Sequence, residues 1–346
     1  MGRLHQANIP VYLLHGNHDA ESQITKRLEL PDNVHVFGAQ QAESFLIDEL
    51  GVSLHGQSFS HRDVSDNLAL QYPKPVENAF NIGVLHTGLG GMGGHANYAP
   101  CALDDLLNRG YQYWALGHVH AATVLNEYPH VVFPGNLQGR HVRETGTKGA
   151  YLVTVQENEV SQITHHACDV VRWIVIRTSA EEADSLNDIL DHIRDAISRS
   201  VSNDVEGRLL ACRLVIEGRT AIHSELISSE DQILADARAI ALGLGNEVAW
   251  VERVVIDTKE VHTERASADH EDAIGELRKM LQEAKSDSDL LQKIEENVGE
   301  LMRKLPHEAK RDADSPQLLA AIDSDYATLI DVVSPYVSAR ILSQED

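Results

Sequence analysis

The sequence predicts a layered α/β domain, followed by a smaller α/β unit and a helical C-terminal region. Three observations lead to this prediction. Short β-rich runs in the first half end in glycine or polar residues, longer strands then alternate with amphipathic helices, and finally Leu, Ile and Met recur at spacings of three and four. The 346 residues are enough for about two or three domains.

In the first half, β-rich runs alternate with segments of helical pattern. Strands are expected at 9–15, 34–38, 45–48, 52–56, 80–86, 111–117, 131–135, 150–155 and 160–165. Helices are expected at 21–29, 62–71 and 102–109. Strands that alternate with helices and end in polar residues indicate a layered α/β domain, which we place at 1–170.

From about Arg172 the pattern changes to a β-α-β-α-β unit. Its strands are expected at 173–177, 209–217 and 247–257, and its helices at 180–200 and 223–243. A unit at 171–262 is large enough to be a small separate domain. Residues 263–346 are expected to form two or three helices, interrupted near Pro306 and 312–316.

Charge and histidine are distributed unevenly. The chain has 29 Lys and Arg against 53 Asp and Glu, a net charge of -24, of which -8 lies in 1–170 and -16 in 171–346. Fourteen of the 19 histidines lie in 1–170, which favours chemistry in that half. The acidity excludes a broadly basic protein that coats nucleic acid. It does not exclude an enzyme of nucleic acid, because bound cations can reverse the local charge.

Neither a membrane span nor a disulfide framework is expected. The sequence has no run of about 18 apolar residues, and its N-terminus lacks the features of a signal peptide. Its three cysteines, Cys101, Cys168 and Cys212, are far apart and form no CxxC pair. These features predict a protein of the reducing cytoplasm.

Three short motifs follow β-rich runs: GNHD at 16–19, His86 at the end of 80–86, and GHVH at 117–120. Loops at strand ends gather the site residues of α/β folds. A lone histidine there is usually a hydrogen-bonded loop residue, whereas two imidazoles two positions apart in a tight loop can converge. The three motifs together therefore indicate a site.

In this order the motifs resemble those of the calcineurin-like metallophosphoesterases, and among them the SbcD/YhaO group of bacterial DNA repair exonucleases. Residues 94–106 (GHANYAPCALDDL) and 133–155 (FPGNLQGRHVRETGTKGAYLVTV) are similar to YhaO-type proteins. The β-α-β-α-β unit is similar to that group's capping domain, and the helical region is covered weakly. The resemblance implies a four-layer metallophosphoesterase β-sandwich flanked by helices.

The resemblance also implies roles for single residues. It implies the following metal ligands: Asn17, His86 and His118 for one ion, and His120 for a second. His18 resembles the catalytic histidine that protonates the leaving oxygen, and Asp19 is expected to orient it. Two ions would hold the phosphoryl oxygens for an in-line displacement by hydroxide. Nitrogen and oxygen ligands of this kind suit Mn²⁺.

Four further residues lie in the segments similar to the family and are candidates for substrate binding: His95, Arg140, His141 and Arg143. The arginines could contact phosphate groups. The alternative is that all four are solvated or hydrogen-bonded loop residues.

Two motifs of the family pattern, Asp-x-His and Gly-Asp-x-x-Asp, should precede GNHD, but residues 1–16 contain no Asp. These motifs supply most ligands of one ion and the carboxylate that bridges both. We expect either an N-terminally truncated chain, lacking on the order of 60–80 residues, or a short protein that kept only binding roles. Two ions are expected in the intact protein, and at most one, weakly bound, in this chain, which is expected to be inactive.

The resemblance thus implies a metal-dependent phosphodiester hydrolase that acts on DNA ends, with a coiled-coil ATPase of the SbcC type as partner. One alternative is a phosphoesterase that acts on a nucleotide or a phosphomonoester. Another is a non-catalytic interaction subunit of an SbcC-like complex. A homodimer is left open, and no membrane association is expected.

Overall fold

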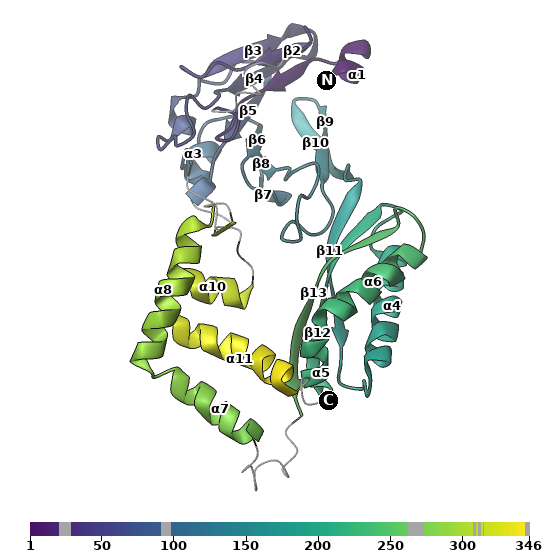
Figure 1. The fold of residues 1–346 in the computed structure, drawn as a ribbon. Helices are drawn as coiled ribbons and strands as arrows, with labels where there is room; N and C mark the ends of the chain where they lie inside the picture. The colour runs from purple at the N-terminus through teal and green to yellow at the C-terminus, as the bar shows by residue number, and fades with distance from the viewer. Residues whose placement is uncertain are drawn as a thin grey trace. The chain divides into compact units, whose positions relative to one another are not determined.

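The computed structural model describes residues 1–20, 29–90, 98–261, 273–306, 309–310, 313 and 315–342. Contacts divide the chain into two compact units, Met1–Trp173 and Ile174–Asp346, and each is described here by itself (Figure 1). The predicted division at 262/263 falls outside the described residues and stays a prediction.

A mixed sheet with strand order β3-β4-β5-β6-β8-β7 forms the centre of unit 1. Its strands are β3 (Glu43–Ile47), β4 (Val52–Gly56), β5 (Phe80–His86), β6 (Tyr113–Gly117), β7 (Thr123–Glu127) and β8 (His130–Phe133). Strands β4, β5, β6 and β8 are parallel, and the edge strands β3 and β7 are antiparallel to their neighbours. The central strands β5 and β6 therefore end at the same edge, where His86 pairs in register with Gly117.

Both faces of this sheet are covered. The hairpin of β9 (Gly149–Gln156) and β10 (Glu159–Ala167) packs on the face that carries Phe80, Tyr113 and Val132. On the other face, the buried Trp114 lies in an apolar cluster with residues of η2 (Leu68–Gln71) and α3 (Leu103–Leu107). A separate two-stranded parallel sheet joins β1 (Val11–Leu13) to β2 (Val34–Val36), and α1 (Gly2–Gln6) precedes it. These sheets and helices confirm a mixed α/β fold, whereas the four-layer sandwich stays a prediction.

Two expectations for unit 1 are wrong. No α-helix forms at 62–71, because the backbone there bonds to distant loops: the Val64 carbonyl accepts from the Ala99 N–H, and Asn67 donates to Asp105. Only the short η2 remains of this segment. Strand β7, which the sequence analysis did not predict, pairs with β8 at the edge of the sheet. The expected helix at 21–29 lies almost entirely outside the described residues.

The β-α-β-α-β arrangement that the sequence predicts starts in the last three residues of unit 1 and continues in unit 2, with the helix expected at 223–243 divided in two at Ser229. The strands β11 (Val171–Ser179), β12 (Leu209–Thr220) and β13 (Ala249–Glu260) pair in this order, and the helices are α4 (Leu186–Asn203), α5 (His223–Ser228) and α6 (Glu230–Gly243). Figure 1 shows α4 and α6 on one face of the sheet, over an aliphatic core that includes Ile193, Leu214 and Val251. Helix α4 starts later than expected because the Ser185 hydroxyl caps it by accepting from the Asp188 N–H.

The C-terminal region is helical, as expected, but is divided more often. Its described helices are α7 (Ala273–Ala284), α8 (Ser288–Lys304), α10 (Pro316–Ile322) and α11 (Tyr326–Leu342). The additional break falls before α8, where the Asp287 carboxylate caps the helix. Lys285 and Asp331 form an ion pair that ties the end of α7 to α11. Throughout the described residues, every helix is too short or too polar to span a bilayer.

Candidate metal-binding and catalytic site

The GNHD motif forms a tight turn after β1. The Gly16 N–H donates to the Asp19 carboxylate over 3.2 Å, and the N–H groups of Asp19 and Ala20 donate back to the Gly16 carbonyl over 3.1 Å. Asp19 therefore shapes the turn, while its expected effect on His18 stays a prediction. The turn buries Asn17, which is 4% exposed, and leaves His18 exposed.

A side-chain contact joins the first two motifs. The Asn17 Oδ1 and the His86 Nε2 are 2.9 Å apart. A Cβ on Gly16 would lie 2.5 Å from the His86 ring, so any larger residue would displace the imidazole. Two neighbouring ligands of one ion, each about 2.1 Å from the metal and about 90° apart, would be separated by about 3 Å. In this structure the His86 Nε2 donates a hydrogen bond to the Asn17 Oδ1. A metal ion bound by both atoms would replace that proton, and their spacing suits two ligands of one ion.

His118 lies beside His86 at the carboxyl ends of β5 and β6. Their ring centroids are 5.2 Å apart, with the ring planes inclined by 70°. The backbone of His118 has a φ of 111°, a conformation that residues other than glycine rarely adopt and that often marks a functional site. Phe59 contacts the His86 ring edge-on and Tyr98 contacts the His118 ring edge-on. These two aromatic contacts, absent from the sequence-based expectations, hold the imidazoles in place.

His86 is held in its neutral form. Burial lowers its pKa, and the neighbouring imidazoles of His118, His18 and His120 lower it further, to about 3. The same electrostatic coupling places all four histidines in one neighbourhood. A neutral imidazole at physiological pH is the form that binds a metal ion.

His120 faces a buried carboxylate that the sequence reading missed. The His120 Nδ1 lies 2.6 Å from the Oε1 of Glu144, which is 7% exposed. Burial alone would raise the pKa of Glu144. Hydrogen bonds from the Arg140 backbone, the His120 imidazole and the Arg140 guanidinium outweigh this effect and lower the pKa to about 2. The two residues are 24 positions apart, so no local sequence signal links them.

Three of the four substrate-binding candidates lie in described loops. The Arg140 guanidinium is 3.3 Å from the Glu144 carboxylate and 3.4 Å from the His120 Nδ1, which places Arg140 at the site. The His141 Nε2 is 3.8 Å from the Glu144 Oε1, and its Nδ1 is buried without a hydrogen-bond partner in the described structure. Arg143 is exposed. His95 lies outside the described residues. Binding of substrate by these residues stays a prediction.

The structure thus brings together Asn17, His86 and His118, with His18 and His120 close enough to influence His86. Within the described part of the chain, no three His, Cys, Asp or Glu side chains are already gathered as a metal site. The contact that fits a metal ion is instead the pair of an amide and an imidazole. An α/β domain with such a pair at its strand ends is a candidate metal-binding domain.

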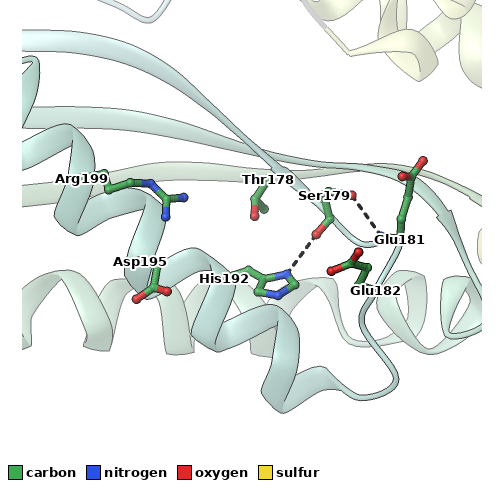
Figure 2. A pocket seen from close by; sticks show the side chains of 7 residues that line it. All are labelled: Thr178, Ser179, Glu181, Glu182, His192, Asp195 and Arg199. Carbon is green, nitrogen blue, oxygen red and sulfur yellow. Dashed lines mark hydrogen bonds between the residues drawn. The ribbon is translucent and has the colours of Figure 1, made fainter.

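A pocket lies in unit 2 and differs in chemistry from the strand-end site of unit 1. This pocket of about 330 Å³ lies beside the end of β11 and α4, and Figure 2 shows its side chains. Its wall includes the carboxylates of Glu181, Glu182 and Asp195 beside Arg199. Three carboxylates would repel a phosphate ester, which makes this pocket a poorer candidate for phosphate binding than the strand ends of unit 1.

Comparisons with known proteins point to metallophosphoesterases. The family model for the middle domain of the metallophosphoesterase YhaO matches residues 173–259, most of the β-α-β-α-β unit. A curated protein of Bacillus subtilis (strain 168), named an uncharacterized metallophosphoesterase YhaO, is 36% identical over 220 residues. That alignment covers 62% of this chain and 53% of the relative, so the chain spans about half the length of the relative. Both findings support the metallophosphoesterase family.

Proposed function

We propose that the strand-end site of unit 1 is part of a metal-dependent phosphodiesterase that acts on DNA ends. The observation that carries the proposal is the 2.9 Å approach of the Asn17 Oδ1 to the His86 Nε2, with His118 beside them. The similarity to a metallophosphoesterase of Bacillus subtilis supports phosphoester hydrolysis. The match of residues 173–259 to the middle domain of YhaO supports a second domain beside the catalytic one.

In this proposal, Asn17, His86 and His118 hold one divalent ion, and His120 contributes to the site of a second. Bound divalent ions, for which Mn²⁺ is our candidate, would polarise the phosphoryl group and supply a hydroxide nucleophile. The exposed His18 would give a proton to the leaving oxygen. Arg140 would orient the phosphodiester through its guanidinium.

This chain is proposed to bind metal and DNA but not to complete the reaction. Its GNHD, His86 and GHVH motifs supply one amide and three imidazole ligands. Two-metal hydrolysis needs two ions that hold the attacking and leaving oxygens, and within the described residues no three His, Cys, Asp or Glu side chains are gathered as a metal site. We further propose a coiled-coil ATPase as partner and a cytoplasmic location, and we leave a homodimer open.

The test compares binding with hydrolysis. Fluorescence anisotropy with Mn²⁺ should show that the chain binds an open-ended DNA duplex more tightly than the same duplex capped by hairpins at both ends. Equal affinity for the two duplexes would contradict action on DNA ends. Hydrolysis of labelled duplex or of bis-p-nitrophenyl phosphate should stay at the rate without protein. Mn²⁺-dependent hydrolysis of either substrate would contradict the inactivity of this chain. Faster release of p-nitrophenol from p-nitrophenyl phosphate than from bis-p-nitrophenyl phosphate would favour the alternative of a phosphomonoester substrate.

A further inference from the structure

The loop after β8 folds back onto the GHVH turn. Gly135 has a φ of 75°, and a Cβ there would lie 2.8 Å from the His120 carbonyl oxygen, so this close approach requires glycine. The same carbonyl accepts from the Asn136 N–H over 3.4 Å and from the Lys148 ammonium over 3.3 Å. Lys148 is 8% exposed. The backbone of His120 is therefore fixed from both ends of this loop.

Glu144 lies in the same loop, and its carboxylate accepts four hydrogen bonds. Its Oε2 accepts from the Asn136 side-chain amide and from the Arg140 backbone N–H, each over 2.9 Å. Its Oε1 accepts from His120 over 2.6 Å and from the Arg140 guanidinium over 3.3 Å. A buried carboxylate is costly unless its oxygens are bonded, and four donors meet that need. A glutamate so fully bonded has one orientation available to it.

This geometry determines the tautomer of His120. An ionised carboxylate only accepts hydrogen bonds, so the His120 Nδ1 must carry the proton in this contact. The Arg140 guanidinium is also close to Nδ1, but a guanidinium is only a donor, and it donates to Glu144. With the proton on Nδ1, the lone pair of the neutral ring is on Nε2.

We propose that Glu144 is a positioning residue: it holds His120 in the Nδ1–H tautomer with the Nε2 lone pair available to a metal ion, and it fixes Arg140 beside it. This inference deepens the proposed function and rests on it for the role of the metal. A carboxylate behind a ligating histidine sets the orientation of its ring and raises its basicity. One side chain would thus set the place of both a metal ligand and a phosphate-binding guanidinium.

The direct test is the nitrogen chemical shift of the His120 ring, measured by ¹⁵N NMR on the metal-free chain. The wild-type protein should show a protonated Nδ1 and an unprotonated Nε2. Glu144→Gln should convert this single tautomer into a mixture that contains the Nε2–H form. Glu127→Gln, an exposed glutamate on β7, is the matched control and should change nothing. The Nε2–H tautomer in the wild-type protein, or an unchanged tautomer in Glu144→Gln, would overturn the proposal.

Two additions keep the test decisive. If Glu144→Gln does not fold, Glu144→Asp keeps the charge but withdraws it by about 1.5 Å, and it should also populate the Nε2–H form. Addition of Mn²⁺ to the wild-type protein then separates the two proposals. Failure of Mn²⁺ to affect the His86 signals would contradict the proposed function, whereas the tautomer of His120 would still decide the role of Glu144.

Discussion

The two units bury very different kinds of polar group. Among the described residues, unit 1 buries twelve polar or charged side chains, including Asn17, His55, Glu144 and the pair of Asp169 and Arg172. Unit 2 buries four, all of them Ser or Thr hydroxyls. Buried amides, imidazoles and charges are costly and need specific partners, whereas an aliphatic core needs only volume and patterning. The difference indicates that the interior of unit 1 depends on specific polar partners, whereas the β-α-β-α-β part of unit 2 depends on aliphatic packing.

The largest effect is expected from breaking a buried ion pair in unit 1. Arg172 and Asp169 form two hydrogen bonds, of 2.9 and 3.1 Å, and their side chains are 4% and 0% exposed. Arg172→Met should lower the free energy of unfolding of unit 1 by about 3–5 kcal/mol, because it leaves a buried carboxylate without its main partner. Urea unfolding measures this loss.

The matched control is Arg177→Met. Arg177 forms an ion pair with Glu217, and the two side chains are 58% and 41% exposed, respectively. The substitution should lower the free energy of unfolding by less than about 1 kcal/mol, as exposed ion pairs usually do. Equal losses for the two variants would remove the energetic contrast between buried and exposed charges on which the comparison depends.

An aliphatic truncation tests the core of unit 2. Ile193 on α4 is fully buried, and Ile193→Ala should lower the free energy of unfolding of unit 2 by about 2–5 kcal/mol through lost burial and a cavity. Ile193→Val, which removes one methyl group, should cost about 0.5–1.5 kcal/mol. The His86 ring signals of unit 1 should not change in either variant. A change there would show that the two units depend on each other.

Acid should weaken unit 1 through its neutral histidines. Burial lowers the pKa of His55, and burial with neighbouring imidazoles lowers that of His86 to about 3, against about 6.5 in an unfolded chain. Their stabilising contribution is therefore complete above pH 6.5 and is lost as the pH falls toward the folded pKa. Each such histidine can remove up to about 1.4 kcal/mol per pH unit.

Urea unfolding at pH 7 and pH 5, followed by NMR signals from each unit, measures this effect. Unit 2 has His223, whose pKa burial also lowers, so some loss is expected there too. His55→Gln should reduce the pH dependence of unit 1. An equal pH dependence of both units in the wild-type protein would contradict the predicted contrast.

A smaller effect is expected from the amide ligand. Asn17→Ala should weaken Mn²⁺ binding about tenfold or more, because it removes one of the three proposed ligands of the ion. Asn17→Asp, which keeps an oxygen at the same place, should retain binding. Isothermal titration calorimetry measures both, and unchanged affinity in Asn17→Ala would show that the ion is held elsewhere.

Much of the site could be predicted because its residues follow strands. His86 and His118 come directly after β-rich runs, and β5 and β6 do lie side by side with their ends at one edge. Glu144 and the aromatic contacts of Phe59 and Tyr98 could not be predicted, since they depend on loops that meet the site only in the folded chain. The helix expected at 62–71 does not form, for the same reason: its backbone bonds to distant loops instead of making local hydrogen bonds.

The central claim is that Asn17, His86 and His118 hold a divalent ion, and paramagnetic NMR tests it most directly. On titration with Mn²⁺, the ring signals of His86 and His118 should broaden first and together, while those of His192 and His223 in unit 2 persist. Asn17→Ala should move this broadening to higher Mn²⁺ concentration. Uniform broadening of all histidines, or persistence of the His86 signals at saturating Mn²⁺, would contradict the account.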